Sequence, residues 1–181
     1  PFYEQKDIEH LEKCRNYIIK KDADRGYRRV VPSPSPLKIV EAHIIKQLVD
    51  QGVIVITAGG GGIPVYIEEN GTYEGVDGVI DKDLTSAILA STIHAEELYI
   101  LTSVEKVAIN YGKKNMQNLD TLSLSQANRY LNEGQFPEGN MGPKIRAAIN
   151  FLESGGKKVI ITSTEQLSNA VTGKTGTHIL P

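Results

Sequence analysis

Three apolar runs along the chain are rich in β-branched residues, and each of them ends in a threonine. They cover residues 53–57, 98–102 and 159–162. Continuous apolar runs of this length are typical of strands that are buried on both faces of a sheet. We therefore expect three buried strands.

Apolar residues outside these runs recur at helical spacing. The pattern predicts four amphipathic helices, over residues 4–20, 38–51, 83–93 and 143–154. The first is closed by the polar run of residues 20–26, and Gly52 and Gly155 stand where C-terminal caps belong. Helices therefore precede all three predicted strands.

The alternation of helices and strands defines the expected fold class. Such chains form α/β domains with a parallel sheet and right-handed crossovers. Ligands of these sheets bind outside the carboxyl ends of the strands. The loops after Thr57, Thr102 and Thr162 should therefore lie on one rim.

Shorter signals complete the expected elements. Residues 64–67 and 73–76 flank an Asn70-Gly71 pair, which favours a β-hairpin. Prolines at three alternate positions of residues 32–36 force an extended loop. We find no internal repeat and no dividing linker, so residues 1–181 are expected to be one domain or the C-terminal part of one.

A capping box is predicted where Ser123 precedes Gln126 by three residues. It begins a helix that runs through about Asn132 and is followed by a loop over residues 133–141.

Composition and charge narrow the function classes. The 20 basic and 22 acidic residues are mixed along the chain and give a net charge of -2, so no basic patch for nucleic acid is expected. The apolar runs fall far short of the roughly 20 residues that span a membrane. The lone Cys14 cannot form an internal disulfide, and the four histidines show no metal-ligand spacing, which fits a cytoplasmic protein without a protein-bound metal.

Four consecutive glycines follow the first predicted strand. Gly59, Gly60 and Gly61, with the glycine after them, either bring a backbone close to an anionic ligand or form a flexible turn. Neither a P-loop nor a Rossmann fingerprint is present, because Ser168 and Pro64 stand where the required glycines would be.

Two lysines stand at predicted helix starts, where a cation is disfavoured by about 0.3 to 1 kcal/mol. Lys82 follows Asp81, and Lys144 follows Pro143, which we place at the first helical position. Either lysine alone could point into solvent, but two such lysines favour a bound phosphate. Convergent lysines stabilise the charge of a moving phosphoryl group, and Asp83 is the candidate to hold them.

Five strings of residues, in this order and at this approximate spacing, resemble the carbamate kinases. They are Arg29-Val30-Val31-Pro32-Ser33-Pro34, Gly59-Gly60-Gly61-Gly62-Ile63-Pro64, Val79-Ile80-Asp81-Lys82-Asp83-Leu84-Thr85-Ser86, Ile109-Asn110-Tyr111-Gly112-Lys113 and Gly139-Asn140-Met141-Gly142-Pro143-Lys144. The likeness covers essentially all 181 residues. Acetylglutamate, uridylate and glutamate 5-kinases share the fold with less of these strings.

The resemblance implies the amino-acid kinase fold, a three-layer αβα sandwich with an open, mainly parallel sheet and a small projecting hairpin. It also implies a cytoplasmic homodimer that transfers a phosphoryl group reversibly between ATP and carbamate with Mg²⁺, mainly toward ATP in arginine catabolism. Lys82 and Lys144 would contact the transferring phosphate and Asp83 would orient them. Residues matching the nucleotide region are Ser103, Val104, Tyr111 and Met141, of which Tyr111 is also a candidate packing residue.

The chain departs from the family pattern in two ways. Asn140 stands where serine is common, and the family's N-terminal part, with its glycine loops and a further lysine, is absent. The absence of an initiator methionine before Pro1 fits a fragment or a processed chain. The fragment alone is therefore expected to be nearly inactive. The alternatives are an acyl-phosphate-forming kinase with another acceptor and a catalytically incomplete nucleotide-binding or dimerising module.

Overall fold

The structure, a computed structural model, describes residues 1–21 and 26–181. The chain divides into two compact units, which we describe separately. Unit 1 comprises residues 1–34 and 63–79, and unit 2 comprises residues 35–62 and 80–181. No helix among the described residues is long and apolar enough to cross a membrane.

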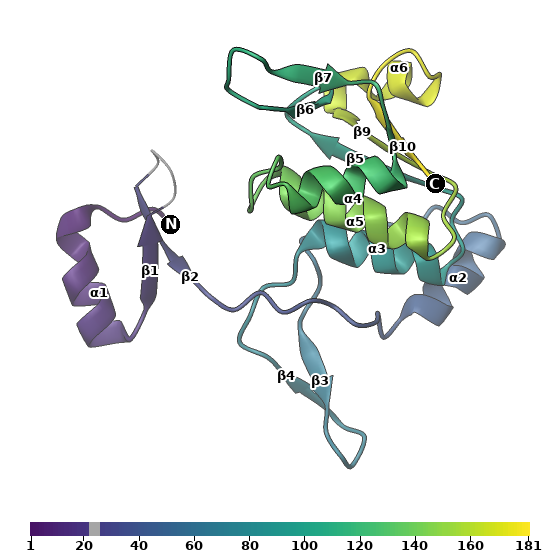
Figure 1. The fold of residues 1–181 in the computed structure, drawn as a ribbon. Coiled ribbons are helices and arrows are strands. Elements are labelled where there is room, and N and C mark those ends of the chain that lie inside the picture. The colour runs from purple at the N-terminus through teal and green to yellow at the C-terminus, as the bar shows by residue number, and fades with distance from the viewer. Residues whose placement is uncertain (22–25) are drawn as a thin grey trace. The chain divides into compact units, whose positions relative to one another are not determined.

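Unit 1 is built from short elements, and its four strands form two antiparallel pairs (Figure 1). They are η1 (Gln5–Asp7), α1 (Ile8–Arg15), β1 (Ile18–Lys21), β2 (Tyr27–Val30), β3 (Val65–Ile67) and β4 (Tyr73–Gly75). The β3–β4 pair confirms the predicted hairpin, in which the side chain of Asn70 accepts a hydrogen bond from the amide of Thr72.

The predicted helix over residues 4–20 is wrong beyond Arg15. Asn16 adopts a left-handed conformation with φ of 53° and ends α1. Residues after it pair with β2, so that Ile18 lies opposite Val30. Sheet pairing has overridden the helical spacing of the side chains. The polar run proposed as the helix stop lies partly outside the described residues, at positions 22–25.

Unit 2 contains the remaining helices and a central sheet. Its elements are α2 (Ala42–Asp50), α3 (Lys82–Thr92), β5 (Glu97–Thr102), β6 (Val107–Ile109), β7 (Gln117–Leu119), β8 (Thr121–Ser123), α4 (Leu124–Asn132), α5 (Met141–Glu153), β9 (Lys158–Ser163), η2 (Thr164–Gln166), α6 (Leu167–Val171) and β10 (Thr177–Leu180). The capping box of Ser123 and Gln126 begins α4 as predicted.

The central sheet is open and mostly parallel, in the order β5-β9-β10-β8. Strand β9 pairs parallel with β5 and antiparallel with β10, and β10 pairs parallel with β8. The strands predicted over residues 98–102 and 159–162 are confirmed as β5 and β9, and Thr102 lies opposite Ser163. The α/β class and the mainly parallel sheet are therefore confirmed.

Helices cover both faces of this sheet (Figure 1). Helices α3, α4 and α5 share a buried cluster with Val159 and Ile161 of β9. Because side chains alternate along a strand, Ile160 points to the opposite face, where α6 packs against β9. Ile160 is fully buried there.

The strand predicted over residues 53–57 is wrong. These residues form no strand, and Ile54 and Ile56 are 93% and 98% exposed. Val55 alone packs against a small cluster that includes Ala42 and Ile45 of α2 and Leu89 of α3. The sequence has the apolar character of a strand, but no neighbouring strand in the described chain pairs with it. The loop after Thr57 therefore follows no strand, unlike the loops after β5 and β9.

Candidate active site

The first candidate lysine stands at the start of α3, as predicted. Asp81 has extended backbone angles and caps the helix, because its Oδ1 accepts hydrogen bonds from the amides of Asp83 at 2.9 Å and Leu84 at 3.1 Å. Lys82 is the first helical residue, and Asp83 follows it. The cap fixes the direction in which both side chains leave the helix.

The second lysine lies further inside its helix than predicted. Helix α5 begins at Met141, so Pro143 is its third residue rather than its first, and Lys144 is its fourth. The chain turns tightly before the helix, because the amide of Gly142 donates to the carbonyl of Pro137 at 3.0 Å. The unusual feature of Lys144 is therefore its burial, with 7% of the residue exposed.

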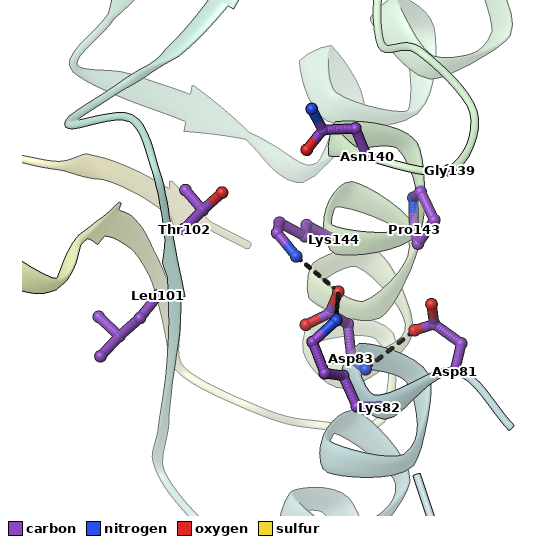
Figure 2. A pocket seen from close by; sticks show the side chains of 9 residues that line it. All are labelled: Asp81, Lys82, Asp83, Leu101, Thr102, Gly139, Asn140, Pro143 and Lys144. Carbon is purple, nitrogen blue, oxygen red and sulfur yellow. Dashed lines mark hydrogen bonds and ion pairs between the residues drawn. The ribbon is translucent and has the colours of Figure 1, made fainter. Parts of the chain in front are cut away.

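Packing of α3 against α5 brings the three predicted catalytic residues together (Figure 2). Lys144 Nζ lies 2.7 Å from Asp83 Oδ2, and Lys82 Nζ lies 3.8 Å from the same oxygen. The side chains of Lys144 and Asp83 are 9% and 10% exposed, whereas that of Lys82 is 59% exposed. One buried carboxylate is thus shared by a buried ammonium group and an accessible one.

These residues line a polar cavity of about 290 Å³. The full lining comprises Asp81, Lys82, Asp83, Leu101, Thr102, Gly139, Asn140, Pro143 and Lys144. Thr102 comes from the end of β5 and lies across the cavity from Lys144 (Figure 2). An ammonium group has three donors, and Asp83 is the only side chain of the described residues with which Lys144 pairs. The cavity is therefore suited to an anion.

A second, less polar cavity of about 100 Å³ shares Thr102 and Asn140 with the first. Its other lining residues are Ser103, Val104, Lys106, Ala108, Tyr111, Phe136, Pro137 and Met141. All four residues predicted for the nucleotide region line this cavity. An aromatic ring and aliphatic side chains suit a flat, weakly polar ring system. The two cavities together match a ligand with an apolar end and an anionic end.

Lys106 lines the second cavity and forms an ion pair. Its Nζ donates to Asp120 Oδ1 at 2.5 Å, and this hydrogen bond raises the pKa of Lys106 above its ordinary value. Lys106 directly precedes β6 and Asp120 directly follows β7, so the pair closes the base of the hairpin whose loop carries Tyr111.

The predicted glycines lie elsewhere. Gly59, Gly60 and Gly61 are not among the described residues that line either cavity. Gly61 instead packs on the backbone of Ile80, directly before the cap of α3. Across the described parts of the chain, no group of three or more histidine, cysteine, aspartate or glutamate side chains is arranged to hold a metal ion.

Several lining residues were not identified from the sequence. Phe136 is 4% exposed within the segment predicted as a loop, and an apolar residue in a polar loop was the available signal. The sequence indicated Thr102 only as the end of a strand. It indicated Asn140 only as a difference from the carbamate kinase pattern. Nothing local distinguished Lys106 or Ala108, because the β6–β7 hairpin that positions them was not predicted.

Two lysines around one buried aspartate, at a polar cavity of an α/β fold, are an arrangement typical of proteins that handle phosphate groups. A model of the Amino acid kinase family matches residues 7–163. The chain belongs to this family.

The relatives that it resembles include carbamate kinases and a carbamate kinase-like protein. The chain is 52% identical over 180 residues to the carbamate kinase-like protein YahI of Escherichia coli K12, covering 99% of this chain and 57% of that protein. It is 48% identical to the carbamate kinase of Pyrococcus horikoshii, covering 100% and 57%. The solved carbamate kinase of Giardia lamblia bound to AMP-PNP superimposes with a TM-score of 0.86 at 44% identity, covering 99% and 57%. The chain thus spans somewhat more than half the length of the relatives it matches.

Proposed function

We propose that this chain is the nucleotide-side part of a carbamate kinase, which transfers a phosphoryl group reversibly between ATP and carbamate. The observation that carries the proposal is the buried Lys144–Asp83 pair, with Lys82 beside it, at the polar end of two adjoining cavities. The identity to carbamate kinases, one of them bound to AMP-PNP, supports this choice within the family.

In the proposed reaction, a carbamate oxygen attacks the γ-phosphorus of ATP and the bond to the ADP oxygen breaks. Carbamoyl phosphate and ADP are the products, and the reverse reaction makes ATP. Lys82 and Lys144 stabilise the negative charge on the moving phosphoryl group. Asp83 keeps both ammonium groups in place without bonding to phosphorus. The adenine lies in the second cavity, beside Tyr111 and Met141.

Mg²⁺ is part of the proposal as an ion carried by the nucleotide. Mg²⁺ in such sites is held largely by substrate phosphates and water, with few protein carboxylates. When bound, the ion supplies positive charge that neutralises the phosphate oxygens.

The resemblance to carbamate kinases also supports a proposal for where the protein works, its oligomeric state and the direction of its reaction. We place it in the cytoplasm as a homodimer that runs mainly toward ATP at the end of arginine catabolism.

A chimera tests the function directly. The 181 residues replace the matched region of the Pyrococcus horikoshii carbamate kinase, and ATP formation from carbamoyl phosphate and ADP is measured. We expect an active chimera, and a loss of about 10² to 10³ in kcat for Lys82→Ala, as for other residues that stabilise transition-state charge. Lys157→Ala is the control, because Lys157 forms an exposed ion pair with Glu96.

The same assay separates the alternatives. A folded chimera that makes ATP faster from acetylglutamyl phosphate than from carbamoyl phosphate would show a different acceptor. A folded but inactive chimera, or equal activity in Lys82→Ala, would contradict a catalytic role. The 181-residue chain assayed alone is expected to be nearly inactive, because it spans 57% of the relative's length.

A further inference from the structure

Gln135 makes a side-chain hydrogen bond within unit 2 that the proposed mechanism does not use. Its Oε1 accepts from the backbone amide of Asn110 at 3.0 Å, across 25 positions of the chain. The residues directly after these two, Phe136 and Tyr111, both line the second cavity. The hydrogen bond therefore joins two segments that form walls of the proposed adenine cavity.

The end of helix α4 fixes the backbone of Gln135. The amide of Gln135 donates to the carbonyl of Tyr130 at 3.0 Å. The amide of Gly134, which has a φ of 70°, donates to the carbonyl of Leu131 at 3.1 Å. These two bonds form a Schellman motif, in which glycine is the usual residue at this position. Phe136 comes next and is 4% exposed, so the Gln135 side chain leaves a backbone that is held on both sides.

The Tyr111 side chain is not held by burial, because 64% of the residue is exposed. Tyr111 is the second residue of a tight turn, in which the amide of Lys113 donates to the carbonyl of Asn110 at 3.0 Å. Gly112, the third residue, has a φ of 75°, as in type II turns. The position of the ring therefore depends on the backbone at the start of the turn, where Gln135 binds.

The base of the β6–β7 hairpin is fixed independently of Gln135. The hairpin is a two-stranded sheet of its own (Figure 1). Thr177 of β10 contacts both of its strands, because its Oγ1 accepts from the amide of Val107 at 2.8 Å and donates to the carbonyl of Leu119 at 2.5 Å. Ile109 also packs against the buried cluster of unit 2. Loss of the Gln135 contact should therefore release the turn and leave the strands in place.

We propose that Gln135 is a positioning residue, whose side-chain carbonyl holds the turn that carries Tyr111 so that the ring lies against the adenine. This inference rests on the proposed function, which places the adenine beside Tyr111 and Met141. Gln135 itself is not among the described residues that line either cavity, so it acts on the nucleotide through Tyr111. Its loss therefore weakens nucleotide binding only while the ring is present.

A double-mutant cycle on the 181-residue chain tests this inference, with the affinity for Mg·ADP measured by calorimetric titration. Gln135→Met keeps the length of the side chain and removes its carbonyl oxygen. It should weaken binding about three- to tenfold, the size expected for one hydrogen bond. Tyr111→Ala should weaken binding about tenfold, because it removes a stacking partner of the base. Adding Gln135→Met to Tyr111→Ala should change the affinity by less than about twofold, because the two residues act as a unit.

Two further variants control the cycle, and thermal unfolding checks that each protein is folded. Gln135→Glu keeps an oxygen acceptor for the Asn110 amide and should bind Mg·ADP within about threefold of the parent chain. Gln166→Met is the matched control, because the Oε1 of Gln166 accepts from Asn169 Nδ2 at 2.8 Å in an exposed pair. We expect it to bind Mg·ADP like the parent chain.

The outcomes separate the inference from the proposed function. If Gln135→Met costs nothing, or costs as much without the Tyr111 ring as with it, the inference is wrong, while binding of Mg·ADP by the parent chain still supports the proposed function. If the parent chain binds no Mg·ADP, the proposed function fails and the inference fails with it.

Discussion

The Lys144–Asp83 pair shows how a single buried interaction can serve both stability and binding. Removing two charges from water costs several kcal/mol per ion, and their attraction repays this only with good geometry. The contact of 2.7 Å gives the pair good geometry, and only about a tenth of each side chain is exposed, so both charges are largely removed from water. Loss of one partner leaves the other charged and buried.

Two variants separate the stabilising role of this pair from its binding role. Lys144→Met should destabilise the chain by about 3 to 5 kcal/mol, because the buried Asp83 loses its close partner and keeps only the exposed Lys82, 3.8 Å away. The double variant Asp83→Leu with Lys144→Met removes both charges and should recover most of that loss. Urea denaturation measures the free energy of unfolding, and titration with AMP-PNP measures binding. Recovery of nucleotide affinity along with stability in the double variant would show that the pair is only structural.

Sequence reasoning identified Lys82, Asp83 and Lys144, and the structure places them together. Lys82 was recognisable because its charge opposes the helix dipole. The burial of Lys144 was not, because it depends on the packing of α3 against α5, which no local pattern encodes. The helix register was wrong for the same reason: the turn at Pro137 and Gly142, not the proline rule, sets the start of α5.

At the scale of elements, strands β5 and β9 formed as predicted, because both are apolar and each has a partner in the sheet. Residues 53–57 have the same character and no partner among the described residues, so they form no strand. Strand β1 lies inside the segment predicted as a helix. Its pairing with β2 joins two separate segments of the chain, and the spacing of side chains within one segment does not reveal it. Local patterns thus predicted which segments are apolar, while pairing decided which of them became strands.

The pairing of β5 with β9 includes a cross-strand ion pair at its edge. Glu97 lies opposite Lys158, with Lys158 Nζ 2.6 Å from Glu97 Oε1, and Tyr99 donates to the other carboxylate oxygen. The hydrogen bond from Lys158, followed by that from Tyr99, lowers the pKa of Glu97 below its ordinary value of 4.5. The folded state therefore binds a proton less readily than the unfolded state.

This shift predicts a pH-dependent contribution to stability. It is fully present above pH 4.5 and is lost as the pH falls through the lowered pKa. Because the pair is partly exposed, we expect at most about 1 kcal/mol. Unfolding in urea between about pH 6 and about pH 3 should show wild type more stable than Glu97→Gln at the upper end only. Glu153→Gln, at the exposed end of α5, is the control, and a difference that persists at the acid end would contradict the assignment.

At the scale of the whole molecule, the exposed apolar segment of residues 53–57 stands out. Val55 packs inward, while its neighbours Ile54 and Ile56 are 93% and 98% exposed. An unpaired apolar segment of this kind is a site of association between chains. The segment is followed by the glycines at positions 59–62, of which Gly61 packs on the backbone of Ile80.

We expect the 181-residue chain to self-associate through this segment as its concentration rises. The double variant Ile54→Lys with Ile56→Lys should stay monomeric at concentrations where the parent chain does not, since charges on an unpaired strand prevent pairing. Its free energy of unfolding should change by less than about 0.5 kcal/mol, because both side chains are exposed. Light scattering over a concentration series measures the association. Leu37→Lys is the matched control, because Leu37 is 93% exposed but lies beside prolines that cannot continue a ladder. Equal association of the parent chain and the double variant would place the contact elsewhere on the molecule.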